Sequence, residues 1–161
     1  MDGHLLIQNA TLILPDRVVD GDLRVSGGSI STIAPGGGLD AGSNEAVIDA
    51  TGLHLLPGAI DPHVHFREPG STEKEDLESG SRAAAAGGVT SFLDMPNNNP
   101  NATNRSTLER KIAIASKKSV THHGFFIGAT NDNIADLQSV EGMEGVCGIK
   151  IFMGSSTGDL L

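Results

Sequence analysis

The sequence predicts an α/β fold in which a β-rich segment precedes alternating strands and helices. From Leu55 onward, apolar strand-like runs alternate four times with helix-like runs over about 100 residues, a pattern typical of βαβ units around a parallel sheet. Before that point, short strand-like runs are separated by turn residues, as in a small antiparallel β unit. We therefore expect a β-rich N-terminal segment over residues 1–54 and four β/α units over residues 55–161.

Turn formers divide the N-terminal segment into short strands. They stand at Pro15-Asp16, at Gly27-Gly28 and over residues 35–38. The glycines at 36–38 lack the Lys, the Ser or Thr and the helix that follow a phosphate-binding loop, so we expect a hairpin turn there. The strands are expected at residues 5–8, 11–14, 22–26, 29–34 and 47–49.

Helix-start signatures recur in the second part of the chain. Thr72 with Glu75, and Ser106 with Glu109, have the spacing of a capping box. The first helix is expected to end at Gly87-Gly88 and the second at about Lys118. Strands are expected at residues 59–66, 89–95, 121–129 and 145–153, and a short third helix at 133–140.

Polar residues stand at or just after the carboxyl end of each expected strand of this second part. They are His63, His65 and Arg67, then residues 97–99, 130–132 and 154–156. Barrels of the (β/α)₈ type place their active sites at strand C-terminal ends. A doubly wound sheet also binds ligands there, but the chain lacks the glycine fingerprint of a dinucleotide site. Because a barrel needs roughly 200 residues or more, we expect the first half of a (β/α)₈ barrel, the N-terminal part of a longer enzyme.

Composition narrows the functional class. The net charge of −9 argues against a nucleic-acid partner, because phosphate binding requires clustered Lys and Arg. A single cysteine, Cys147, excludes an intrachain disulfide and suits a reducing compartment. The sequence shows neither a signal peptide nor an apolar run long enough to span a membrane, so a cytoplasmic protein with no membrane partner is expected.

The pair His63 and His65 predicts a metal site. Side chains alternate along an extended chain, so His63, His65 and Arg67 are expected on the same side. Two imidazoles at a strand end can bind one divalent metal, and an arginine just beyond can hold an anionic substrate. An isolated His-x-His is usually structural, but its place at a strand end favours the metal interpretation.

Lys150 is a charged residue in the otherwise apolar run 146–152. Such an ammonium is costly to bury unless it is paired. One interpretation is a lysine that extends to solvent from a strand end. The other is a lysine whose pKa is lowered by burial and nearby cations, so that the neutral amine can react with carbon dioxide. The resulting carbamate is an anionic ligand able to bridge two metals.

Three further polar residues lie near these candidates. Asn97 stands at the end of the second strand and could donate to a substrate carboxylate beside Arg67, whereas the next two asparagines fit a turn. Asp61 is expected to be a hydrogen-bond partner behind the histidines, and Glu68 to be structural. Cys147, in the middle of a strand with no paired histidine, is expected to be a small core residue.

The chain resembles the dihydroorotases, which are cyclic amidohydrolases of the amidohydrolase superfamily. Residues 57–70 look like the first-strand signature of that family, and residues 74–81 like its following helix. Residues 94–97 look like its second-strand motif, and residues 148–156 like the strand of its carboxylated lysine. The resemblance covers nearly the whole chain.

This resemblance implies a barrel beside a small composite β domain built from both chain ends, with two Zn²⁺ ions. His63 and His65 would bind the more buried ion, carboxylated Lys150 would bridge both, and Arg67 and Asn97 would bind the substrate carboxylate. The implied reaction is the reversible cyclisation of N-carbamoyl-L-aspartate to dihydroorotate, a step of pyrimidine biosynthesis. The general-base aspartate and two more metal-binding histidines are expected beyond Leu161, so residues 1–161 alone are expected to be inactive.

Alternatives remain open at this point. Dihydropyrimidinase, hydantoinase and allantoinase also hydrolyse cyclic amides, but their substrates lack this carboxylate, and Arg67 with Asn97 favours a carboxylated substrate. A non-catalytic dihydroorotase-like partner of aspartate carbamoyltransferase is disfavoured by the intact His63, His65 and Lys150. A homodimer and an association with aspartate carbamoyltransferase are further open possibilities.

Overall fold

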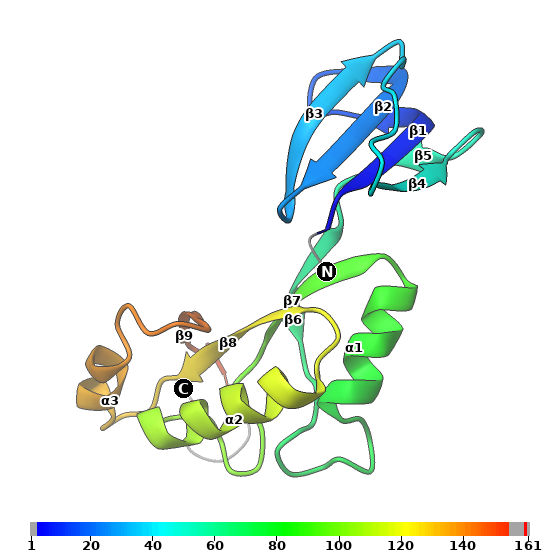
Figure 1. Ribbon diagram of the computed structural model, residues 1–161. Helices are drawn as coiled ribbons and strands as arrows, with labels where there is room; N and C mark the ends of the chain where they lie inside the picture. The colour runs from blue at the N-terminus through cyan, green and yellow to red at the C-terminus, as the bar shows by residue number, and fades with distance from the viewer. Residues whose placement is uncertain (1–2, 155–159, 161) are drawn as a thin grey trace. The chain divides into compact units, whose positions relative to one another are not determined.

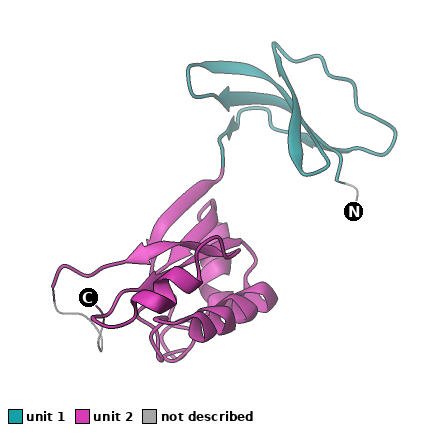
Figure 2. Ribbon diagram, turned by 90° about the vertical axis from the view of Figure 1, so that its left-hand side faces the viewer, with its two compact units in different colours: residues 1–57 teal, residues 58–161 magenta. Residues whose placement is uncertain are grey.

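The computed structural model describes residues 3–154 and residue 160 of the 161-residue chain. The chain divides into two compact units, Met1–Pro57 and Gly58–Leu161 (Figure 2). The predicted boundary lies between residues 54 and 55. Ser155 and Ser156, part of the last motif singled out in the sequence, lie outside the described residues. In the described part of the chain, no helix is long and apolar enough to cross a membrane.

The first unit is a five-stranded mixed sheet. Its path runs β3-β2-β1-β4, and β5 also pairs with β1. The strands are β1 (Leu5–Ile13), β2 (Val18–Ser26), β3 (Ser29–Pro35), β4 (Ala46–Asp49) and β5 (His54–Leu55). The expectation of a purely antiparallel unit is wrong, because β4 and β5 both pair with β1 in parallel. These pairings join segments that local turn patterns do not connect.

A bulge joins two expected strands into one. β1 runs through residues 5–13 without a break, and its register against β2 shifts between Ile7 and Ala10. Asn9 within this shift has φ 60°, a left-handed conformation that asparagine tolerates better than most residues. The local polarity of residues 8–11 therefore marks a bulge and not the end of a strand.

Asp22 is a buried carboxylate at the centre of this unit. It accepts hydrogen bonds from the backbone N–H groups of Asn9 at 2.9 Å and Leu39 at 3.0 Å. These bonds lower the pKa of Asp22, although burial opposes them. The glycine run 36–38, with positive φ at every position, brings Leu39 to this carboxylate. It is not the hairpin turn expected, because the strand before it, β3, pairs with β2 and the next strand, β4, pairs with β1.

The second unit is a four-stranded parallel sheet with helices between the strands, as predicted (Figure 1). The strand order is β6-β7-β8-β9, which is also the order along the chain. The strands are β6 (Ala59–Val64), β7 (Val89–Asp94), β8 (His122–Gly128) and β9 (Val146–Lys150). The helices are α1 (Leu77–Ala86), α2 (Arg105–Lys118) and α3 (Ile134–Ser139). Because all four strands are parallel, their carboxyl ends lie along one edge of the sheet.

Both long helices begin at residues other than those predicted. The N-cap of α1 is Asp76, whose carboxylate accepts the N–H of Ser79 at 2.7 Å. The N-cap of α2 is Asn104, whose side chain accepts the N–H of Thr107 at 2.9 Å. The expected capping boxes at Thr72 and Ser106 are therefore wrong. Asp and Asn are at least as good as Ser and Thr at an N-cap, and here they compete successfully for the helix start.

An apolar cluster formed by residues of the strands and of the helices α1 and α2 contains Phe66, Leu77, Phe92 and Phe125. Phe66 packs edge-on against Phe92 with ring centroids 4.6 Å apart. Gly80 in α1 makes room for it, since a Cβ there would lie 2.7 Å from the Phe66 ring.

Cys147 is exposed on β9, which is an edge strand of the described sheet. Its prediction as a core residue is therefore wrong.

Candidate metal and substrate site at the strand ends

His63 and His65 lie at the carboxyl end of β6, which ends at Val64. Their ring centroids are 5.2 Å apart, a separation that lets two imidazole nitrogens share one metal ion. Phe66, the next residue, is buried in the core. Among the residues that the structure describes, no three His, Cys, Asp or Glu side chains gather as a metal site. Within the described residues, the structure therefore brings two imidazoles together and no third such side chain beside them.

Asn97 contacts His65 directly. The Nδ1 atom of His65 lies 2.7 Å from the Oδ1 atom of Asn97, and an amide oxygen can only accept, so Nδ1 is the donor. This hydrogen bond favours the tautomer of His65 with the proton on Nδ1 and the lone pair on Nε2. Histidines that bind a metal through Nε2 use this tautomer, with the Nδ1–H donated to a neighbouring oxygen. Asp61, predicted to be a hydrogen-bond partner behind the histidines, accepts the backbone N–H of His63 at 3.1 Å and has no hydrogen bond to an imidazole among the described residues.

Arg67 follows on the same loop and is half-buried. In the described part of the chain, its guanidinium makes no hydrogen bond, ion pair or ring contact. A half-buried guanidinium with free donors can bind a planar anion such as a carboxylate in a bidentate manner. Arg67 is therefore available to a ligand, whereas Asn97 is engaged with His65.

Lys150 is the last residue of β9, at the same edge of the sheet but separated from β6 by β7 and β8. It is half-buried, its backbone carbonyl accepts the N–H of Ala129 at 3.0 Å, and its ammonium lies 5.0 Å from the Phe152 ring centroid. The structure brings His63, His65 and Asn97 together and puts Lys150 at the far end of the same row of strand ends.

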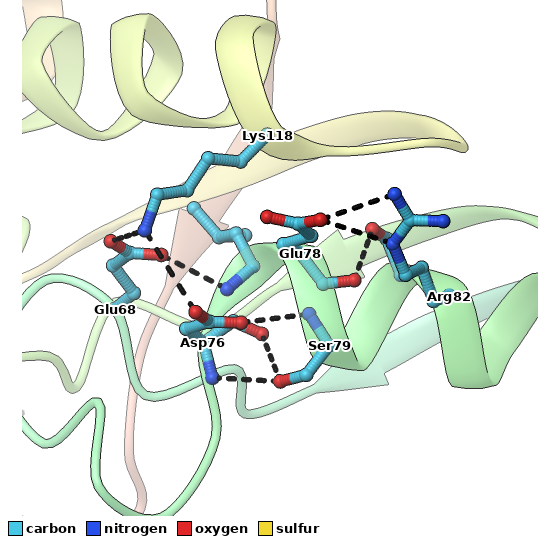
Figure 3. Close-up of polar contacts among 8 residues, drawn as sticks. Glu68, Asp76, Glu78, Ser79, Arg82 and Lys118 are labelled. Carbon is cyan, nitrogen blue, oxygen red and sulfur yellow. Dashed lines mark hydrogen bonds and ion pairs between the residues drawn. The ribbon is translucent and has the colours of Figure 1, made fainter.

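Glu68 anchors the loop after β6, which carries His65 and Arg67 (Figure 3). One carboxylate oxygen accepts the N–H of Leu77 at 3.0 Å, and the other lies 2.6 Å from the ammonium of Lys118. This ion pair raises the pKa of Lys118. Glu68 thus joins the loop to the start of α1 and to the end of α2. Its predicted structural role is confirmed.

A buried ion pair between Asp94 and Lys111 is a feature that the sequence patterns did not predict. The two side chains are fully buried, with Oδ2 and Nζ 2.8 Å apart. Burial raises the pKa of Asp94 and lowers that of Lys111, while the attraction between the two charges opposes both shifts. One signal was present: Lys111 stands three residues after Leu108 and four before Ala115, on the buried face of α2.

Comparison with known proteins places these features in a wider group. Residues 54–144 match the Amidohydrolase family. An allantoinase of Deinococcus radiodurans is 39% identical over 157 residues, which are 97% of this chain and 34% of that protein. A dihydroorotase of Methanosarcina acetivorans is 39% identical over 154 residues, 96% of this chain and 32% of that protein. The chain thus spans about a third of the length of these relatives.

Solved structures agree on the fold. The L-hydantoinase (dihydropyrimidinase) of Arthrobacter aurescens has a TM-score of 0.87 at 24% identity, covering 99% of this chain and 35% of the other. The dihydropyrimidinase of Brevibacillus agri NCHU1002 has a TM-score of 0.81 at 31% identity, covering 98% of this chain and 34% of the other. The predicted fold class, the first half of a (β/α)₈ barrel after a β segment, is confirmed.

Proposed function

The chain belongs to the amidohydrolase family, and on this premise we propose that the protein carrying it hydrolyses a cyclic amide at a divalent metal site. The observation that carries the proposal is the pair of imidazoles 5.2 Å apart at the end of β6, with His65 oriented by Asn97. Relatives named dihydroorotase and allantoinase support this reaction class equally, at the same identity.

The donor set fits zinc as far as it extends. His63 and His65 would supply two nitrogen ligands, and Lys150, once carboxylated, a bridging oxygen ligand to a second zinc. Bound zinc would acidify a water molecule and polarise the amide carbonyl of the substrate. Asn97 keeps the tautomer of His65 that leaves Nε2 free for the metal. Glu68 holds the loop against α1 and α2 while the substrate binds.

Arg67 leads us to propose dihydroorotate as the substrate, interconverted with N-carbamoyl-L-aspartate. Its guanidinium, which has no partner among the described residues and follows the two histidines in the chain, suits a cyclic amide that carries a carboxylate. Asn97 is the second candidate contact to that carboxylate; its amide nitrogen is the donor, because its oxygen is engaged with His65. Allantoin and hydantoin lack a carboxylate, so Arg67 would contribute nothing specific to their binding.

Replacing Arg67 with Met tests this choice. In the longest natural polypeptide that carries the chain, we expect R67M to raise the KM for dihydroorotate about ten-fold or more, because a charge-assisted hydrogen bond is lost. The KM for hydantoin is expected to change by less than about two-fold. The matched control is Arg110→Met, an exposed arginine of α2. A preference of the parent protein for allantoin or hydantoin, or an equal effect of R67M on both substrates, would contradict the dihydroorotate assignment and favour the hydantoinase-type alternative.

Zinc analysis separates the enzyme from the non-catalytic alternative, a structural partner of aspartate carbamoyltransferase. In the longest natural polypeptide that carries the chain, we expect about two zinc ions per polypeptide after dialysis, as a binuclear site requires. Less than one zinc ion per chain would support the structural-partner interpretation.

A further inference from the structure

Lys111 is buried in the middle of α2 with no exposed surface. Its ammonium makes three polar contacts, all with the end of β7 and the loop that follows. They are the carboxylate of Asp94 at 2.8 Å, the carbonyl of Met95 at 2.8 Å and the side-chain oxygen of Asn98 at 2.6 Å. The ammonium also lies 4.9 Å from the Phe125 ring centroid. An amphipathic helix needs only apolar residues on this face, so a charge here requires its own explanation.

Two of these partners extend the contacts to the loop after β6. Asp94 accepts the backbone N–H of Phe66 at 3.0 Å through its other carboxylate oxygen. The amide of Asn98 donates to the carbonyls of Phe66 and Glu68, both at 3.1 Å. The N–H and the carbonyl of Phe66 are therefore both held by side chains that Lys111 contacts. Phe66 is the residue between His65 and Arg67.

Lys111 also contacts residues on both sides of Asn97 in the sequence. Met95 and Asn98, which flank the Pro96-Asn97 dipeptide, each offer an oxygen to Lys111. The hydrogen bond between Asn97 and His65 joins the two loops on the side where the histidines lie. Thus the backbone beside His65, Arg67 and Asn97 is held to one buried cation.

We propose that Lys111 is a positioning residue that acts through Asp94 and Asn98 to set the geometry of His65, Arg67 and Asn97. The proposal rests on the proposed function for what those three residues bind. Hydrogen bonds to a charge are stronger in a buried, low-dielectric site than in water, and several of them from one atom define direction as well as distance. Small displacements of such groups carry large costs in binding and turnover.

The test uses the longest natural polypeptide that carries the chain. K111M alone leaves Asp94 buried without its cation, so this variant can fail to fold. The combination D94N/K111M removes both charges and keeps an oxygen to accept the N–H of Phe66. A second variant, N98A, keeps the ion pair and removes only the link to Phe66 and Glu68. The matched control is Lys117→Met, the same change at an exposed position of α2.

We expect folded D94N/K111M and folded N98A to lose zinc affinity by about ten-fold and to raise the KM for dihydroorotate by a similar factor, as displaced supporting groups do. Lys117→Met should leave zinc affinity and KM within about two-fold of the parent. A network that only stabilises the fold would lower the melting temperature without moving zinc affinity or KM in the folded protein. That result in N98A or in the double variant overturns the proposal.

Failure of the proposed function is recognisable separately. A parent protein that binds zinc but turns over none of dihydroorotate, allantoin and hydantoin contradicts the proposed function. The zinc affinities of N98A and Lys117→Met then still decide the role of Lys111: a loss in the first alone supports it, and equal affinities overturn it.

Discussion

Among the described residues, each unit has one buried aspartate, and the two carboxylates are stabilised in opposite ways. Asp22 in the first unit is 2% exposed and accepts backbone N–H groups, which lower its pKa. Asp94 in the second unit is fully buried beside Lys111, and burial raises its pKa. Backbone N–H donors stabilise the Asp22 anion without a second charge. The same hydrogen bonds fix the bulge at Asn9 and the turn before Leu39. An ion pair needs a partner from another element, so it couples α2 to the strand ends.

This contrast predicts the largest stability effect at Asp94. Replacing it with Leu leaves Lys111 charged and buried without its anion, which is expected to lower the free energy of unfolding by about 3–5 kcal/mol. Adding Lys111→Met should recover most of this loss, because no unpaired charge then remains. Chemical denaturation followed by far-UV circular dichroism measures both variants. If the double variant is no more stable than Asp94→Leu, the loss does not come from the unpaired charge.

A smaller, pH-dependent effect is expected at Asp22. Its folded pKa lies below the ordinary value of 3.8, so the stability that it contributes is fully present above that value and is lost as the pH falls through the folded pKa. At neutral pH, Asp22→Asn should cost about 1–3 kcal/mol, because two backbone donors lose a charged acceptor. Denaturation at a series of acidic pH values should show the parent's advantage shrinking. An advantage that stays constant down to the lowest pH would contradict a lowered pKa.

Helix starts show how far sequence patterns extend. The predicted end of α1 at the glycine pair is confirmed, because Gly87 is its C-cap and acts locally, and the predicted end of α2 at about Lys118 is confirmed as well. The starts were misplaced, since several candidate caps stand close together and the choice between them depends on packing. Glu68 accepts the N–H of Leu77 from a distant loop and so contributes to the start of α1 at Asp76.

The candidate site also combines features that the sequence predicts with contacts that only the structure shows. The pair His63 and His65, followed by Arg67, could be predicted from an alternating pattern at a strand end. The contact between His65 and Asn97 spans two loops and was not predicted, whereas Asp61 bonds to the backbone of His63 within its own strand. The proposed metal role of Lys150 remains a prediction.

The sequence by itself determined the order of strands and helices in the second unit, the place of the strand-end histidines and the family, because all of these depend on residue type and short-range spacing. Only the tertiary structure decided that β4 and β5 pair with β1 in parallel, that Asn97 supports His65, and that Lys111 reaches Asp94, Met95 and Asn98. The reason is physical. Local patterns report which side of an element faces inward, whereas the partner it meets there depends on strand order, register and the packing of distant segments.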